Sequence, residues 1–336
     1  MTRLGLIGAG AIAQTYIDAA ERIDDLKITA ICDINERIRE SAAERIGCKA
    51  YASAAEMFDA ETLDGVIVTA PPAAHEDLTT EALKRSIAVL CEKPFTVDSS
   101  SAVAMIAASK QSGAPVAMAS KFRYVEDIVK ARSLIDSGII GDVLLVDNLF
   151  AAPVDMSARW NSEAAVSGGG VLIDNGTHSV EIVRYLAGPI RMVRAVTETF
   201  AGGLGVEDTA MLFVECEGGA KAHIELSWTV PKKSPNFITL YGSKGTIEIG
   251  WQASRYMRNT DTEWTVFGKG YDKIDAFKRN LEDFRGAIRG GKMRTTIADA
   301  LASVRAIEAA YLSASSGGWC DVDGEPDLKA VGVTGL

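Results

Sequence analysis

The stretch LGLIGAGAIA at residues 4–13 decides the fold of the first part of the chain. A short apolar strand, Leu4–Ile7, runs directly into a G-x-G-x-x-A pattern that begins at Gly8, continues through Gly10 and ends at Ala13. In this pattern the first glycine makes a tight turn, the second lets the backbone approach a pyrophosphate, and the last small residue packs helix against strand. A helix that begins here presents free N–H groups to an anion. The residues expected to contact a dinucleotide are Gly8, Gly10, Ala11 and Ile12.

Short apolar runs recur outward from this stretch through the first 120 residues. They are continuous rather than alternating, as expected of strands buried on both faces of a parallel sheet. Segments with helical spacing lie between them, for example 35–46 and 75–85. This alternation predicts that residues 1–121 form a doubly wound α/β domain with a parallel sheet, and the glycine turn predicts that the domain binds NAD(P). The expected strands are Leu4–Ile7, Ile28–Cys32, Val66–Thr69, Ile87–Cys91 and Val116–Ala119.

The pattern changes near residue 120. After a helical segment at 126–137, longer strands are separated by short turns such as Gly218-Gly219 and Ser243-Lys244-Gly245, which predicts an antiparallel sheet. Helical patterns at 274–289 and 297–315 close the chain. We assign residues 122–336 to an α+β domain for substrate binding and oligomerisation. Its expected strands are Val143–Phe150, Arg194–Phe200, Ala210–Glu215, Ala220–Trp228, Ile238–Tyr241 and Thr246–Ile249.

Composition and charge narrow the class of protein. The chain has 336 residues, 47% of them hydrophobic, with a net charge of −10. That charge disfavours a nucleic-acid binder and a protein that adheres to anionic membranes. No apolar run reaches the ~20 residues of a membrane span, and a strand begins at once without a leader pattern. Five widely spaced cysteines without a CxxC pair predict reduced thiols and no zinc site. We therefore expect a cytoplasmic protein with no metal site.

Asp33 is the residue that we expect to favour one of the cofactors NAD and NADP over the other. It ends the second expected strand, 25 residues after Gly8, close to the spacing of an acid that binds the adenosine ribose. A carboxylate there repels a 2′-phosphate and favours NAD over NADP. Arg37 lies near enough to reach a 2′-phosphate, so NADP stays open, and Asp33 alternatively caps the helix that follows it.

Two loops at the carboxyl ends of strands carry further candidates, because ligands of open α/β sheets bind at that edge. One is Thr69-Ala70-Pro71-Pro72 followed by His75, and the other is Glu92-Lys93-Pro94. Desolvation of a lysine in a cleft lowers its pKa and suits proton transfer. The alternatives are that His75 only begins a helix and that Lys93 is an exposed lysine at a strand end. The expected cofactor contacts in these loops are Thr69, Pro71, Pro72, His75, Glu92 and Lys93.

The second half contains the run GGGVLIDNGTH at residues 168–178. Apolar residues then recur at helical spacing, which places Asp174 and His178 on one helical face as an i, i+4 pair. A carboxylate beside an imidazole raises its basicity and orients it for proton transfer. The alternative is a pair on a helix surface. Three consecutive glycines also let the backbone pass close to a ligand.

Taken together, these motifs resemble the Gfo/Idh/MocA family, named for glucose–fructose oxidoreductase and inositol dehydrogenase. The resemblance rests on the glycine turn, both strand-end loops, the run at 168–178 and the late turn at 241–246, and it covers nearly the whole chain. Ala13 stands in place of a third glycine. The resemblance implies an N-terminal Rossmann domain and a C-terminal α+β domain with an open, mainly antiparallel sheet.

The resemblance also implies a reaction, namely NAD(P)-dependent hydride transfer at the carbinol carbon of a sugar, cyclitol or related polyol. Lys93, Asp174 and His178 fall on the catalytic positions of the family. His178 would take the hydroxyl proton, Asp174 would hold the imidazole, and Lys93 would hydrogen-bond the same oxygen as alkoxide character develops. Two other functions remain open: a hydrolase or epimerase that cycles bound NAD without net oxidation, and a non-catalytic regulator that senses nucleotide.

Substrate contacts are expected from two places. Lys121 and Arg123 follow the last strand of the first domain, and Asp155, Arg159 and Trp160 precede the glycine run. An aromatic ring stacks on a sugar face, although Trp160 would equally pack a domain interface, and the two arginines would also suit an acidic or phosphorylated substrate. The full expected set is Lys93, Lys121, Arg123, Asp155, Arg159, Trp160, Asp174 and His178.

The second domain also predicts assembly. Strands such as Ala220–Trp228 place apolar residues at alternate positions, and the last helices cover only one face of so wide a sheet. An uncovered apolar face marks an interface. We expect a homodimer or homotetramer through this sheet, as the resemblance also suggests.

Overall fold

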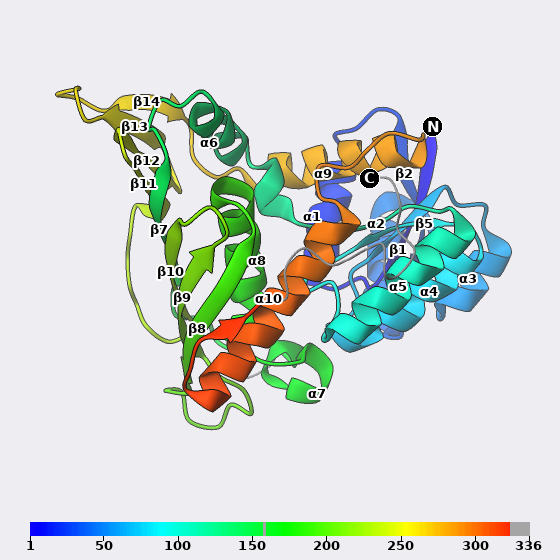
Figure 1. Ribbon diagram of the computed structural model, residues 1–336. Coiled ribbons are helices and arrows are strands. Elements are labelled where there is room, and N and C mark those ends of the chain that lie inside the picture. The colour runs from blue at the N-terminus through cyan, green and yellow to red at the C-terminus, as the bar shows by residue number, and fades with distance from the viewer. Residues whose placement is uncertain (157–158, 323–336) are drawn as a thin grey trace. The chain divides into compact units, whose positions relative to one another are not determined.

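The computed structural model describes residues 1–156 and 159–322 (Figure 1). Contacts within the chain divide these residues into two compact units. Unit 1 contains residues 1–121 and 273–301, and unit 2 contains residues 122–272 together with the described residues from 302 onward. Unit 1 thus joins the first 121 residues to a later segment of the chain.

Unit 1 is built on a parallel sheet, as predicted. Among its described residues, six strands lie in the order β3-β2-β1-β4-β5-β6, and all of their pairings are parallel. The chain moves outward on one side from β1 to β3 and then returns to β4 on the other side of β1, so the strand order reverses at β1 and β4. The strands are β1 (Thr2–Ile7), β2 (Leu26–Cys32), β3 (Lys49–Tyr51), β4 (Gly65–Val68), β5 (Ala88–Cys91) and β6 (Val116–Met118).

Helices accompany these strands in unit 1, and all but the last of them connect one strand to the next. They are α1 (Ala11–Ala20), α2 (Glu36–Ile46), α3 (Ala54–Ala60), the short 3-10 helix η1 (Pro72–Ala74), α4 (His75–Lys84), α5 (Ser99–Ser112) and α9 (Lys273–Ile288). The last of these packs against α1, with the rings of Tyr16 and Phe277 edge to face at 4.8 Å. Phe277, Leu281 and Phe284 are fully buried in the same hydrophobic core as β1. Helix α9 therefore packs in unit 1 because its apolar face is buried in that core.

Unit 2 is a mainly antiparallel sheet with helices, again as predicted. Its described residues form nine strands in the order β14-β13-β12-β11-β7-β10-β9-β8-β15, and only the pairing of β7 with β10 is parallel. The strands are β7 (Val143–Ala151), β8 (Ile190–Glu198), β9 (Thr209–Cys216), β10 (Lys221–Ser227), β11 (Asn236–Gly242), β12 (Gly245–Gly250), β13 (Ser254–Arg258), β14 (Thr265–Gly268) and β15 (Cys320–Asp321).

One face of this sheet is covered by helices. The helices of unit 2 are η2 (Lys121–Tyr124), α6 (Glu126–Asp136), η3 (Trp160–Ser162), α7 (Ala164–Ser167), α8 (Val171–Ala187) and α10 (Ile297–Ser316), of which η2 and α10 begin in unit 1. Helix α8 lies across β7 to β10 (Figure 1). Alternate residues of the strands, such as Leu212 and Ile224, are buried on this side. A Cβ at Gly176 of α8 would lie 3.2 Å from both Ile307 and Leu226, so the glycine permits this close packing.

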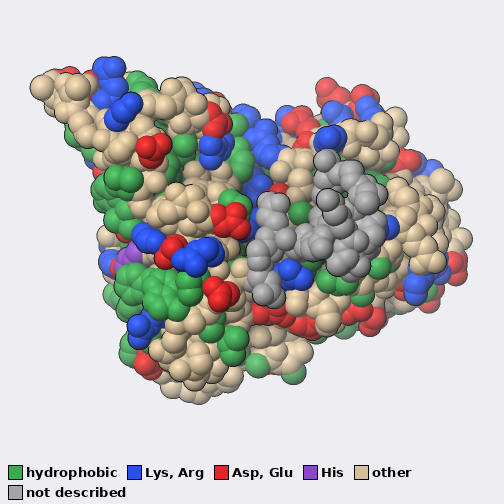
Figure 2. All heavy atoms as spheres, in the orientation of Figure 1, with side chains coloured by type: hydrophobic (Ala, Val, Ile, Leu, Met, Phe, Trp, Pro, Cys, Tyr) green, Lys and Arg blue, Asp and Glu red, His purple; other side chains and the backbone are tan. Residues whose placement is uncertain are grey.

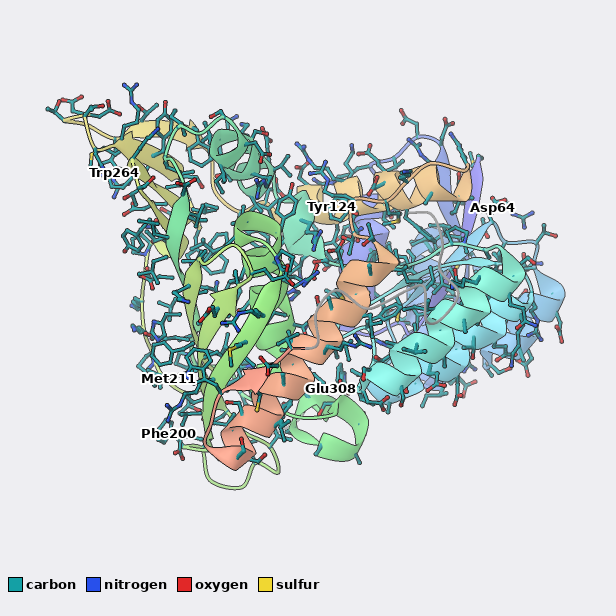
Figure 3. All side chains as sticks on the ribbon, viewed as in Figure 1. Asp64, Tyr124, Phe200, Met211, Trp264 and Glu308 are labelled. Atoms are coloured by element: carbon teal, nitrogen blue, oxygen red, sulfur yellow. The ribbon has the colours of Figure 1, made fainter. Side chains whose placement is uncertain are left out.

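The opposite face of the sheet, which we call the open face, carries the intervening residues. Met211 and Phe213 on β9 are 49% and 54% exposed, and Met211 projects away from α8 (Figure 3). Val196, Leu145 and Tyr241 lie on the same face by strand register and are also exposed. The space-filling view shows hydrophobic side chains gathered over the strands of unit 2 (Figure 2).

No helix in the described part of the chain is long and apolar enough to cross a membrane.

Candidate active site

The glycine turn of unit 1 is held by the loop that follows β4. Gly8 has a φ of +91°, and a Cβ there would lie 2.8 Å from the backbone nitrogen of Ala70. The hydroxyl of Thr69 donates to the carbonyl oxygen of Gly8 at 2.6 Å. The first glycine is therefore required by this close approach of the two loops, and Thr69 fixes the turn from within the protein.

The second glycine leaves room for a ligand. Gly10 is the residue before α1, where no side chain caps the helix. A Cβ on Gly10 would meet nothing within 4 Å. The N–H groups of the first turn of α1, at Ala11 and Ile12, thus face a region that this chain leaves open, which is the arrangement that binds a pyrophosphate. Ala13 is fully buried in the core, as its predicted packing role requires.

Asp33 turns toward this glycine turn. Its two carboxylate oxygens each accept a backbone hydrogen bond at 2.7 Å, one from Ala9 and one from Asn35. Asn35, rather than Asp33, caps α2 by accepting from the nitrogen of Ile38. The alternative in which Asp33 is the helix cap is therefore wrong. Ile34, the next residue, is 95% exposed, an unusual position for a large apolar side chain beside an expected nucleotide site.

The side chain of His75 is held inside unit 1. It begins α4 and is completely buried. Its Nε2 lies 2.8 Å from the carbonyl oxygen of Ala70, and its Nδ1 lies 2.9 Å from that of Pro94. Burial lowers the pKa of the imidazole. The ring therefore ties the loop after β4 to the loop after β5 and positions both, and contact of His75 with the cofactor stays a prediction.

Glu92 has a similar internal role beside Lys93. Its carboxylate is buried, and one carboxylate oxygen accepts a hydrogen bond of 2.8 Å from the hydroxyl of Tyr16. The other oxygen accepts the backbone N–H of Lys93 at 2.9 Å. These two bonds fix the backbone at Lys93, and the Lys93–Pro94 peptide is cis. The side chain of Lys93 is partly exposed at the carboxyl end of β5, at the edge of the sheet where Thr69 and Gly8 also lie.

In unit 2, Asp174 and His178 lie on α8 as predicted. Because they are four residues apart, they share one face of the helix. His178 is 8% exposed, and the Phe122 ring stands edge-on to its imidazole at 5.0 Å. Asp174 is more accessible and lines a pocket. The geometry places a carboxylate and an imidazole one helical turn apart, with the carboxylate at a pocket wall.

The glycines before α8 have a structural explanation that differs from the predicted ligand contact. A Cβ on Gly169 would lie 2.0 Å from the hydroxyl of Tyr311, and one on Gly170 would lie 1.9 Å from the carbonyl oxygen of Glu207. One carboxylate oxygen of Glu207 accepts the backbone N–H groups of Gly170 and Leu172, both at 3.0 Å, and the Tyr311 hydroxyl at 2.8 Å. Glu207 therefore caps the helix that carries Asp174.

Arg123 is turned into unit 2. Its Nε donates to Glu181 at 2.9 Å, and its guanidinium carbon lies 5.3 Å from the ring centroid of Tyr185. Both charged side chains are buried, and the hydroxyl of Ser303 also donates to Glu181. Arg123 thus clamps η2 to α8, and substrate contact by Arg123 stays a prediction. Lys121 lies with its ammonium 6.0 Å from the ring centroid of Phe277.

A pocket in unit 2 has a volume of about 770 Å³. It brings Asp174 together with Arg159, whereas the exposed Trp160 and Asp155 are not among its lining residues. Trp228, Trp251 and Phe150 form an aromatic part of the wall. The remaining lining residues are Leu149, Ala151, Ala152, Pro153, Val154, Met156, Asn175, Ser227, Pro231, Lys232, Lys233, Ser234 and Pro235.

Sequence reasoning missed several residues of this site. Glu181 lies seven residues after Asp174, and a carboxylate between the apolar Val180 and Ile182 is the signal that could have indicated a buried charge. Glu207 and Tyr311 had no such signal, because they are distant in sequence from α8. The pair Lys232 and Lys233 follows a proline in a loop, and nothing in that local sequence indicates a pocket.

Comparison with known proteins agrees with this architecture. Residues 2–120 match the oxidoreductase family with an NAD-binding Rossmann fold, and residues 128–248 match the GFO/IDH/MocA C-terminal domain. The rhizopine catabolism protein MocA of Rhizobium meliloti is 30% identical over 313 residues, which cover 92% of this chain and 93% of that protein. Inositol 2-dehydrogenase of Corynebacterium glutamicum is 24% identical over 286 residues, 81% of this chain and 82% of that enzyme.

A solved structure shows the same fold. An oxidoreductase from Agrobacterium radiobacter in complex with NAD⁺, L-tartaric acid and magnesium superposes with a TM-score of 0.87 at 23% identity, covering 96% of this chain and 98% of the other. The family suggested by the motifs is confirmed by a relative that matches along almost the whole length. The chain belongs to the Gfo/Idh/MocA family of NAD-binding oxidoreductases.

Proposed function

We propose that this protein is an NAD-dependent dehydrogenase that transfers hydride between the nicotinamide and a carbinol carbon of a sugar, cyclitol or related polyol. The observation that carries the proposal is the pair Asp174 and His178 on one face of α8, with Asp174 at the wall of a pocket. An inositol dehydrogenase among the relatives supports a polyol as the substrate class.

The residues present fit the cofactor. The uncapped start of α1 and the open space at Gly10 would hold the pyrophosphate. Asp33 would accept the ribose hydroxyls, because each of its oxygens has a further lone pair beyond the one backbone bond it accepts. Ile34 would cover the adenine with its exposed side chain. When bound, the nicotinamide supplies the hydride acceptor or donor. The carboxylate of Asp33 favours NAD over NADP by repelling a 2′-phosphate.

Three side chains carry the proton chemistry. His178 takes the proton of the substrate hydroxyl as general base. Asp174 orients the imidazole and stabilises its charged form. Lys93 donates a hydrogen bond to the same oxygen as negative charge develops there. Loss of His178 should therefore reduce turnover more than loss of the Asp174 charge. Without His178 the proton acceptor is gone, whereas without the Asp174 charge the imidazole is still present but is a weaker base.

Three variants test the proposal. We expect His178→Ala to reduce turnover by ~10²–10⁴-fold while NAD affinity, measured by titration, barely changes. Lys93→Ala should act similarly and also weaken substrate binding. Asp174→Asn should be milder than His178→Ala, since it keeps a hydrogen-bonding group.

The measurement is the absorbance of reduced nicotinamide released with cyclitols, aldoses and sugar acids. Release of free NADH also distinguishes a dehydrogenase from an enzyme that cycles its bound NAD. Near-parental turnover by His178→Ala on the best substrate would make His178 structural.

We also propose that the chain assembles into a homodimer or homotetramer through the open face. The support is the row of exposed apolar side chains at Met211, Phe213 and Val196, which neighbour one another across β8 and β9. Met211→Glu should yield monomers in light scattering at micromolar concentration. Leu312→Glu, at a similarly exposed position on α10, is the matched control and should leave the assembly intact. A monomeric parent protein would refute the proposal.

A cytoplasmic location is the last part of the proposal. Its support is that all five cysteines are free thiols, and three of them, Cys32, Cys91 and Cys216, are buried. Free buried thiols are typical of reducing compartments. Fractionation of the native host with antibody detection is the test, and recovery in an extracytoplasmic fraction would contradict it.

A further inference from the structure

The charged residues that line the 770 Å³ pocket of unit 2 are mostly positive, whereas the net charge of the chain is negative. The protein carries a net charge of −10, whereas the charged residues lining this pocket are Arg159, Lys232, Lys233 and a single acid, Asp174. Three cations and one anion therefore face a space in which the proposed catalytic carboxylate lies. A neutral polyol gives no reason for such an excess of positive charge.

Two of these cations form no ion pair with the residues that the structure describes. Lys232 forms an ion pair with Glu225. Arg159 and Lys233, by contrast, have no carboxylate of the described residues within ion-pair distance, and both are exposed. Their charges are thus available to a ligand. Because Arg159 precedes η3 and Lys233 follows β10, the two cations reach the pocket from separate loops.

The remaining walls suit the carbon frame of a sugar. Trp251 is 40% exposed and lies 4.6 Å, ring to ring, from the buried Phe237, so its position is supported from behind. Together with Phe150 it offers an apolar surface to C–H groups. Asn175, next to Asp174, adds donors and an acceptor for hydroxyls. The pocket therefore combines an apolar wall, hydroxyl-binding groups and unpaired positive charge.

We propose that the substrate carries an anionic group, a carboxylate or a phosphate, which Arg159 and Lys233 bind while the carbinol carbon lies toward Asp174. The inference rests on the proposed function and deepens it by naming the substrate class as an acidic sugar or cyclitol derivative. Arginine and lysine differ in a useful way here: the guanidinium binds an oxyanion through two parallel hydrogen bonds, and the ammonium adds a point charge.

The test compares glucose with three anionic derivatives of it. Glucose, gluconate, glucuronate and glucose 6-phosphate are titrated calorimetrically into the NAD-loaded protein, and kcat/KM is measured for each. We expect at least one anionic ligand to bind about tenfold or more tightly than glucose, with a preference that weakens as salt rises. Comparison of the carboxylate and phosphate ligands identifies which anion the site takes. Equal or weaker binding of all three anions relative to glucose would overturn the proposal.

Variants of Arg159 and Lys233 test whether these two side chains cause the preference for anionic ligands. Arg159→Gln and Lys233→Gln should each reduce the ratio of anion affinity to glucose affinity by about tenfold. Lys244→Gln, which removes an exposed charge of unit 2 from the β11–β12 turn outside the pocket, is the matched control and should change neither. Retention of the full preference in the double variant would refute the assignment. Calorimetry needs no turnover, so an anion preference without NADH formation would count against the proposed reaction and not against this site.

Discussion

Replacement of Glu207 tests whether the start of α8 is held in place from outside the helix. Gly170 contributes no side-chain cap, and the carboxylate of Glu207 accepts the N–H groups of Gly170 and Leu172 in its place. The backbone N–H of Asp174 in turn donates to the carbonyl of Gly170 at 3.1 Å. The first turn of α8, and with it Asp174, therefore depends on Glu207.

The magnitude follows from the three bonds that one oxygen of Glu207 accepts, from Gly170, Leu172 and Tyr311. A hydrogen bond to a charged group contributes about 1.5–3 kcal/mol, and loss of a helix cap costs about 1 kcal/mol. Because the bonds share one acceptor, they do not add fully. We expect Glu207→Ala to lower the free energy of unfolding by about 3 kcal/mol. Glu207→Gln retains an acceptor oxygen and should lose about 1 kcal/mol.

The assay is urea unfolding in parallel with steady-state kinetics. Displacement of the first turn should lower kcat/KM of Glu207→Ala by roughly tenfold to a hundredfold, because a shift of about 1 Å in a catalytic group has that effect. Glu207→Gln should recover most of this loss. Glu217→Ala, an exposed glutamate in the β9–β10 turn, is the control and should match the parent. A Glu207→Ala protein with parental stability and activity would refute the role given to Glu207.

Three further outcomes are expected. Asp33→Ala should narrow the ratio of the NAD and NADP dissociation constants, measured by titration, and tighter NADP binding by the parent protein would contradict the role of Asp33. Burial raises the pKa of the Cys32 thiol to about 11, so at pH 8 its labelling by a thiol reagent should be about a hundredfold slower in the folded protein than in urea, as followed by mass spectrometry. Arg123→Met should cost about 3–5 kcal/mol in urea unfolding by leaving the buried Glu181 unpaired, and the double variant with Glu181→Leu should regain stability; no recovery would show that the charge is not the cause.

Most of the fold could be predicted from the sequence because the patterns that indicate it are local. The glycine turn, the continuous apolar runs and the alternating strands each appear within a few neighbouring residues, and the parallel and antiparallel sheets, the family, the enzyme class and the NAD cofactor were all confirmed. Strands without such a signal were missed. The short β3 and β13, SRYMR, lack an apolar run, and β8 begins at Ile190 rather than at Arg194.

The site was harder to predict than the fold, because its supporting contacts join distant segments. The bond from Tyr311 to Glu207 spans 104 positions, and the one from Tyr16 to Glu92 spans 76. A sequence shows that a residue is polar, but not that its partner folds beside it. His75 illustrates the result: its position after two prolines suggested contact with a cofactor, whereas its ring nitrogens face carbonyl oxygens of two loops.

The place of α9 in unit 1 has a consequence for biosynthesis. Phe277, Leu281 and Phe284 fill the core on which α1 rests, and burial of each such side chain is worth about 1.5–3 kcal/mol, together comparable to the whole stability of many domains. A nascent chain that has left the ribosome only as far as residue 121 already contains every strand of the parallel sheet but lacks this packing. We therefore expect the parallel sheet to become stable only after α9 has been translated, and a chain truncated before α9 to be bound by chaperones or degraded rather than to bind NAD.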